Sequence, residues 1–203
     1  MKIFCIGRNY INHAKELKNA VPSSPVIFMK PSTALLIKNK PLYYPSFTKE
    51  LHYEAELVVK ICKNGRHVQK EFAHTYYNAY TLGIDFTARD VQRELKSKGL
   101  PWELAKAWDH SAAIGEFIPI SKYFDIQEVD FSLQKNGERV QSGRTSDMIF
   151  PIDDLIVYIS QFFKLQHGDI LFTGTPAGVG PVEIGDRLVG YVEGEPLLNC
   201  EIR

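Results

Sequence analysis

The fold of this chain is decided by one stretch, Tyr53-Glu54-Ala55-Glu56-Leu57-Val58-Val59-Lys60-Ile61. It is rich in β-branched and aromatic residues, which is typical of a β-strand. Alternate side chains of a strand share a face, so Glu54 and Glu56 point the same way and the apolar residues form the other face. Two neighbouring carboxylates in a buried sheet repel each other, and desolvation adds to that cost. A divalent cation relieves both penalties; the alternative is a solvated strand face.

A third carboxylate strengthens the metal-site hypothesis. Asp85 stands at the end of an apolar run, just before a helix that we predict over residues 88–97. Three carboxylates, completed by water and substrate oxygens, form the hard-ligand set that suits Mg²⁺ or Mn²⁺. An Asp at this place is also a common cap or turn residue, which is the alternative. The six histidines lack the spacing of a zinc protease.

The rest of the sequence predicts a β-rich α+β fold. Further strands are expected at 2–6, 26–29, 131–134, 139–141, 169–173, 187–192 and 197–202. Asn64-Gly65 and Asn136-Gly137 each predict a tight hairpin. Helices are expected at 10–18, at 88–97 behind a Thr87–Asp90 capping box, and at 152–163. No βαβαβ rhythm suggests a dinucleotide-binding fold.

The composition excludes several classes of protein. The 203 residues contain 24 Lys and Arg and 24 Asp and Glu, and this zero net charge argues against a nucleic-acid or membrane partner. No apolar stretch approaches the roughly 18 residues that span a bilayer. The three cysteines are widely separated, which suits a reducing compartment. The start of the chain shows no signal peptide, so we expect a cytoplasmic protein with one domain, residues 1–203.

Other residues are candidates for catalysis and substrate binding. His13 and Glu16 are three residues apart on a predicted helix, an arrangement that prepares a histidine as a general base, although exposed pairs of this kind are common. Lys106 lies among apolar residues, where it would pair with a substrate carboxylate or serve as a structural lysine. Arg89 and Gln92 share a helix face and suit an acid group or solvent.

Together these segments resemble the fumarylacetoacetate hydrolase family, and most closely its acylpyruvase and oxaloacetate decarboxylase branch. The segments that carry the resemblance run in order over nearly the whole chain. They are Gly7-Arg8-Asn9-Tyr10, Phe28-Met29-Lys30-Pro31-Ser32-Thr33, Glu54-Ala55-Glu56-Leu57, Asp85-Phe86-Thr87-Ala88-Arg89-Asp90-Val91-Gln92, Gly99-Leu100-Pro101-Trp102, Ala105-Lys106, and the run from Gly168 to Gly180.

The resemblance implies a fold and a set of roles. The fold is a mixed β-roll with a short N-terminal lid helix, usually in a homodimer that binds Mg²⁺ or Mn²⁺. The implied metal ligands are Glu54, Glu56 and Asp85. The implied catalytic residues are Lys106 and the His13–Glu16 dyad of the lid, and the implied substrate-binding residues are Arg89, Gln92, Thr175 and Lys30. The segment Trp108-Asp109-His110-Ser111 varies among related branches, which leaves the substrate open.

The expected activity is cleavage of a carbon–carbon bond in a small 2-keto acid through a metal-bound pyruvate enolate. The reaction would be hydrolysis of an acylpyruvate, decarboxylation of oxaloacetate, or both. One alternative is a 2-hydroxyhepta-2,4-diene-1,7-dioate isomerase or a related hydratase on the same scaffold. Another is a metabolite-binding protein without catalysis.

Overall fold

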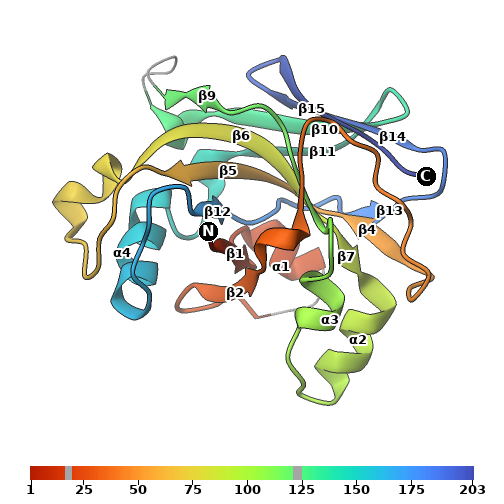
Figure 1. The fold of residues 1–203 in the computed structure, drawn as a ribbon, viewed down its shortest axis with the longest axis horizontal. Helices are drawn as coiled ribbons and strands as arrows, with labels where there is room; N and C mark the ends of the chain where they lie inside the picture. The colour runs from red at the N-terminus through yellow and green to blue at the C-terminus, as the bar shows by residue number, and fades with distance from the viewer. Residues whose placement is uncertain (17–19, 121–124) are drawn as a thin grey trace.

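The computed structural model describes residues 1–16, 20–120 and 125–203. Its fold is α+β and rich in strands, with a curled main sheet, and this confirms the predicted fold class (Figure 1). No helix among the described residues is long and apolar enough to cross a membrane.

The described residues form three sheets. The largest contains, in spatial order, β2 (Val26–Lys30), β1 (Ile3–Gly7), β12 (Ile170–Phe172), β5 (Ala55–Ile61), β6 (Tyr77–Asp85), β8 (Ala112–Ile114) and β3 (Leu35–Leu36), and β9 (Ile118–Pro119) also pairs with β6. The second contains β11 (Glu138–Arg144), β10 (Asp130–Lys135), β14 (Arg187–Val192) and β15 (Glu195–Glu201). The third is small and contains β13 (Gly180–Pro181), β4 (Leu51–Tyr53) and β7 (Thr87–Ala88).

The main sheet is buried on both faces. Leu57 and Val59 of β5 pack against α4 (Ile152–Phe162) and against residues of the second sheet such as Phe131. Val58 points the other way and packs with residues of β1 and β12, including Phe172. Both faces of β5 therefore exclude water, and any charge on this strand needs a partner.

Two Asn-Gly pairs in the sequence have different structural roles. Asn136-Gly137 forms the predicted hairpin between β10 and β11, and both residues have the positive φ that a tight hairpin turn requires. The prediction for Asn64-Gly65 is wrong, because β5 reaches β6 through a longer connection that contains a 3₁₀ helix, Lys70–Thr75. Gly65 instead allows close packing, since an added Cβ would lie 2.5 Å from the hydroxyl of Tyr76.

Three short helices surround the entrance to the site. They are α1 (Ile11–Glu16), α2 (Arg89–Ser97) and α3 (Glu103–Lys106), and the end of the helix predicted at 10–18 lies outside the described residues. The predicted Thr87–Asp90 capping box is wrong. Thr87 belongs to β7, where its extended backbone turns the hydroxyl toward Lys106. Asp90 accepts hydrogen bonds from Thr48 and from the backbone of residues 49 and 91.

Candidate active site

The site begins at a break in the strand predicted over residues 53–61. β4 ends at Tyr53 in the small sheet, β5 begins at Ala55 in the main sheet, and Glu54 lies between them. The backbone carbonyl of Glu54 accepts a hydrogen bond of 2.8 Å from the backbone N–H of Asp85. Because β5 and β6 are antiparallel, this bond brings the end of β6 to the start of β5.

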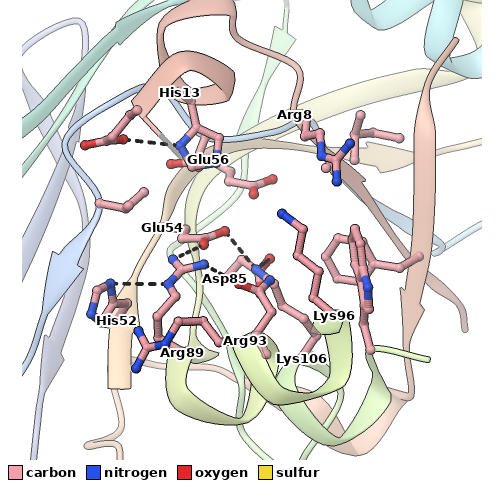
Figure 2. A pocket seen from close by; sticks show the side chains of 18 of the residues that line it. Arg8, His13, His52, Glu54, Glu56, Asp85, Arg89, Arg93, Lys96 and Lys106 are labelled. Carbon is pink, nitrogen blue, oxygen red and sulfur yellow. Dashed lines mark hydrogen bonds and ion pairs between the residues drawn. The ribbon is translucent and has the colours of Figure 1, made fainter. Parts of the chain in front are cut away.

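The three predicted metal ligands converge at this point. Carboxylate oxygens of Glu54, Glu56 and Asp85 all lie within 4.8 Å of one another. All three residues are at most 5% exposed. They line a cavity of about 350 Å³, and Figure 2 shows their side chains at its centre.

Buried cations neutralise two of the three carboxylates. The ammonium nitrogen of Lys106 lies 2.8 Å from Glu54 and 2.7 Å from Asp85, and Arg89 donates to the other oxygen of Glu54. Burial alone would raise the pKa of Glu54, but Lys106 and Arg89 outweigh it and hold that pKa well below its usual value. Burial alone would lower the pKa of Lys106, yet Asp85 and Glu54 raise it, so the ammonium stays protonated.

Glu56 has a different environment. Its carboxylate accepts a hydrogen bond of 2.7 Å from the backbone N–H of Gly174, and no cation of the described residues forms an ion pair with it. Burial, together with the charges of Asp85 and Glu54, raises the pKa of Glu56 well above its usual value. An all-oxygen cluster with one carboxylate left without a cation fits a hard divalent ion. Glu54, Glu56 and Asp85 would hold that ion.

Lys30 lies beneath the cavity and does not line it. Its ammonium group is fully buried and lies 2.7 Å from Asp85. It also donates to both the carbonyl and the hydroxyl of Ser111 at 3.0 Å, and to the backbone carbonyl of Lys106. Lys30 is not among the residues that line the cavity, and its predicted contact with substrate stays a prediction. The side chain holds Asp85 and the segment that carries Lys106.

The lid helix α1 places a histidine over the acidic cluster. His13 is 5% exposed, and its Nδ1 lies 3.4 Å from a carboxylate oxygen of Glu16. The same carboxylate accepts the backbone N–H of Gly178 at 3.1 and 3.3 Å, which fastens the helix to the loop after β12. Burial lowers the pKa of His13, so the ring is neutral at pH 7.

The remaining predicted site residues also meet the cavity. Besides Glu54, Arg89 donates to Gln92 at 2.6 Å and, through Nε, to His52 at 3.4 Å. Thr175 is buried and accepts a hydrogen bond from Gln141. The structure therefore brings together every residue of the predicted site except Lys30 around one cavity.

Comparisons with known proteins agree with this geometry. The profile described as "Fumarylacetoacetate (FAA) hydrolase C-terminal" matches residues 2–203. The chain belongs to the fumarylacetoacetate hydrolase family. It is 45% identical over 192 residues to a Bos taurus protein named "Oxaloacetate tautomerase FAHD1, mitochondrial", covering 95% of this chain and 87% of the relative. It is 44% identical over 197 residues to "Oxaloacetate tautomerase YcgM" of Escherichia coli, covering 97% and 90%.

A solved structure of the same family is also similar. The fumarylpyruvate hydrolase from Pseudomonas aeruginosa, in complex with Mn²⁺ and pyruvate, superposes with a TM-score of 0.95. It is 38% identical to this chain, and the match covers 100% of this chain and 89% of that one. The family relationship thus extends to enzymes of small keto-acid metabolism.

Sequence reasoning missed several residues of this family member's site. His52 lines the cavity, with Nε2 3.2 Å from Glu50, and it shares the even-numbered alternation of Glu54 and Glu56. Following every second residue from Glu56 and Glu54 back toward the N-terminus would have identified His52 as a candidate. No local signal points to Gln141, which lies on β11 and accepts the backbone N–H of Ala55 at 2.9 Å. Such a residue reaches the site only through the packing of two sheets.

Proposed function

We propose that this chain interconverts the keto and enol forms of oxaloacetate with the help of a divalent cation held by Glu54, Glu56 and Asp85. One observation carries the proposal: a buried acidic cluster and a neutral histidine face the same cavity. The names of the bovine and bacterial relatives support the choice of reaction and substrate. When bound, Mg²⁺ or Mn²⁺ would supply Lewis-acid polarisation of the keto oxygen.

His13 is the proposed base. With Nδ1–H donating to the Glu16 carboxylate, Nε2 carries the lone pair. Nε2 would take a proton from C3 of the keto acid, which leaves an enolate. The imidazolium would then give the proton to the enolate oxygen, or return it to C3 in the reverse direction. Glu16 stabilises the charged ring during this exchange.

Lys106 acts as a fixed positive charge. Its ammonium group donates to Glu54, Asp85 and Thr87, so its three hydrogens are used and it is not a base. Held in a buried site, this charge stabilises the negative oxygen of the enolate without reorganisation. Arg89 pairs with the carboxylate oxygen of Glu54 that Lys106 does not contact, and so restrains that side chain.

A second candidate is cleavage of a carbon–carbon bond in an acylpyruvate or in oxaloacetate. The similarity to a fumarylpyruvate hydrolase favours it. Both reactions need the same enolate of the 2-keto acid. The two cleavages differ in the fragment released beside the enolate: hydrolysis adds water to the distal carbonyl and releases a carboxylic acid, and decarboxylation releases CO₂.

The two activities are separated by one set of assays. The enol absorbance of oxaloacetate and the release of pyruvate are followed together, with added Mg²⁺ or Mn²⁺ and with EDTA; acetylpyruvate and fumarylpyruvate are tested for pyruvate release. Faster loss of enol without pyruvate supports the tautomerase, and pyruvate release supports cleavage. Full activity in EDTA would refute the metal role. No turnover of any keto acid would favour a metabolite-binding protein.

Homodimerisation and a cytoplasmic location stay predictions.

A further inference from the structure

Arg8 is one of the basic side chains that line the cavity. Among the basic residues that line it, Arg89 is bound to Glu54, Arg93 is bound to Glu50, and Lys106 is bound within the acidic cluster. The guanidinium of Arg8 makes no hydrogen bond or ion pair with any residue that the structure describes. A charge in this position has the capacity to bind a ligand.

The backbone at Arg8 is unusual. Its φ is +63°, a left-handed conformation that favours glycine. Seven non-glycine residues of the described chain have a positive φ, and Arg8 is the one that lines the cavity. Conformations of this kind persist where the surroundings impose them, and they cluster at functional sites.

The neighbours of Arg8 explain why its backbone cannot relax. Gly7 is the last residue of β1. Asn9 is fully buried and exchanges side-chain hydrogen bonds with the backbone of Phe150, and it donates to the carbonyl of Thr173 at 2.7 Å. Arg8 thus lies between the end of β1 at Gly7 and the buried side chain of Asn9, and both are fixed by their hydrogen bonds. In Figure 2 its side chain lies across the cavity from Glu54 and Arg89.

The two ends of the cavity differ in charge. At one end, the acidic cluster would hold a cation and, through it, the keto-acid end of the substrate. The guanidinium of Arg8 lies across the cavity from Glu54 in Figure 2, and the lining also contains an aromatic pair, Phe28 and Trp102, whose ring centroids are 5.7 Å apart. A guanidinium binds a carboxylate through two parallel hydrogen bonds.

We propose that Arg8 binds the second carboxylate of a dicarboxylic 2-keto acid and so makes the site select dicarboxylic over monocarboxylic substrates. This inference rests on the proposed function, in which Glu54, Glu56 and Asp85 would hold a cation that binds the keto-acid end of the substrate. The selectivity then comes from the opposite end of the same cavity.

The test compares Arg8→Asn and Arg8→Lys with the unaltered protein in Mg²⁺. Asn tolerates a left-handed backbone, so Arg8→Asn removes the charge without adding strain. A matched control is Lys38→Asn, since Lys38 has a φ of +61° and is exposed outside the cavity. The substrates are oxaloacetate, followed by enol absorbance, and pyruvate, followed by exchange of its C3 hydrogens with deuterium in NMR.

For Arg8→Asn, we expect the ratio of kcat/KM for oxaloacetate to that for pyruvate to fall about 10- to 100-fold, the loss typical of a charge-assisted contact. Arg8→Lys should recover part of this ratio, and Lys38→Asn should leave it unchanged. An unchanged ratio in Arg8→Asn, whether or not overall activity falls, would overturn the proposal.

Failure of the proposed function is recognised separately. If the unaltered protein turns over neither substrate, the tautomerase proposal fails, and the role of Arg8 is then read from calorimetric binding of oxaloacetate and pyruvate. A preference for oxaloacetate that disappears in Arg8→Asn supports the assignment of Arg8. If Arg8→Asn prefers oxaloacetate over pyruvate as strongly as the unaltered protein does, the assignment of Arg8 is overturned.

Discussion

The floor and the lid of the cavity are built in different ways. The floor is the cluster of Glu54, Asp85, Lys106 and Lys30, whose charges are buried and joined by ion pairs of 2.7 to 2.8 Å. The carboxylate of Glu16 ties the lid helix α1 to the backbone of Gly178 through longer bonds of 3.1 and 3.3 Å, and the contact within the dyad is 3.4 Å. The side chain of Glu16 is 34% exposed.

This difference suggests a division of roles. A buried network of charges is rigid, because each group that moves leaves another without its partner. Such a floor keeps the carboxylates of Glu54 and Asp85 in place before any substrate arrives. The bonds that tie the described part of the lid to the loop after β12 are long and come from one partly exposed carboxylate, so the lid suits the entry and release of a small molecule. The predictions below test whether stability comes from the floor and turnover from both.

The largest effect is expected from Lys30→Met. The change removes the buried ammonium that pairs with one carboxylate oxygen of Asp85 and that donates to the carbonyls of Lys106 and Ser111, so the free energy of unfolding should fall by about 3–5 kcal/mol. Urea denaturation measures it. The matched control is Lys135→Met, where the ammonium is partly exposed and lies 3.5 Å from Asp186, and the expected loss is below about 1 kcal/mol. If the two variants lose similar free energy of unfolding, the buried ion pairs of the floor are not a special source of stability.

The next effect is expected from Glu56→Gln. It removes the one carboxylate of the cluster that has no cation, so the affinity for Mn²⁺ measured by calorimetry should fall at least about 100-fold, with turnover falling alongside. Thermal stability without metal should stay the same or rise, because a strained buried charge is gone. A variant that binds Mn²⁺ as tightly as the unaltered protein would rule out Glu56 as a ligand.

His13→Ala tests the lid without disturbing the floor. Loss of the proposed base should lower kcat about 100-fold, while the midpoint of thermal unfolding changes little. The same variant addresses the isomerase alternative: unchanged turnover of a 2-hydroxydienoate, with loss of keto-acid turnover, would favour that reaction.

The pH dependence of turnover follows from the same residue. Burial lowers the pKa of His13 from its ordinary value of 6.5, so the ring is neutral at pH 7 and the base is active there. Activity should hold as the pH drops through 6.5 and should fall only as the pH passes below this lowered pKa and the ring becomes protonated, by about tenfold per pH unit from there. His13→Ala should lack this limb of the profile. An identical profile in both proteins would assign it to another group.

Glu16→Gln should have the smallest effect. The amide oxygen still accepts the N–H of Gly178, but the charge that stabilises the His13 imidazolium is lost. We expect turnover to fall about two- to tenfold, the range of a single hydrogen bond. Glu94→Gln, which alters an exposed carboxylate on α2, is the control, and an equal effect in both would refute a role for the dyad.

Much of the floor could be predicted from local sequence. The alternation of Glu54 and Glu56 and the place of Asp85 at a strand end are short-range patterns, and the structure brings these three together. The break at Glu54 was not predictable, because a strand changes sheets only when its neighbours are in place. The bond between Thr87 and Lys106 and the ion pair between Lys30 and Asp85 were not predictable for the same reason. In both cases the two partners are distant in sequence.

The pairing of β1 with β12 has a consequence for biosynthesis. Asn9 and the carbonyl of Thr173 are 164 residues apart in sequence, and the carboxylate of Glu56 and the N–H of Gly174 are 118 apart. Neither bond exists until residues near 174 have left the ribosome. A nascent chain therefore exposes its acidic residues long before β12 and the loop after it are made. The site forms only after that segment is translated, and folds with such distant contacts form slowly.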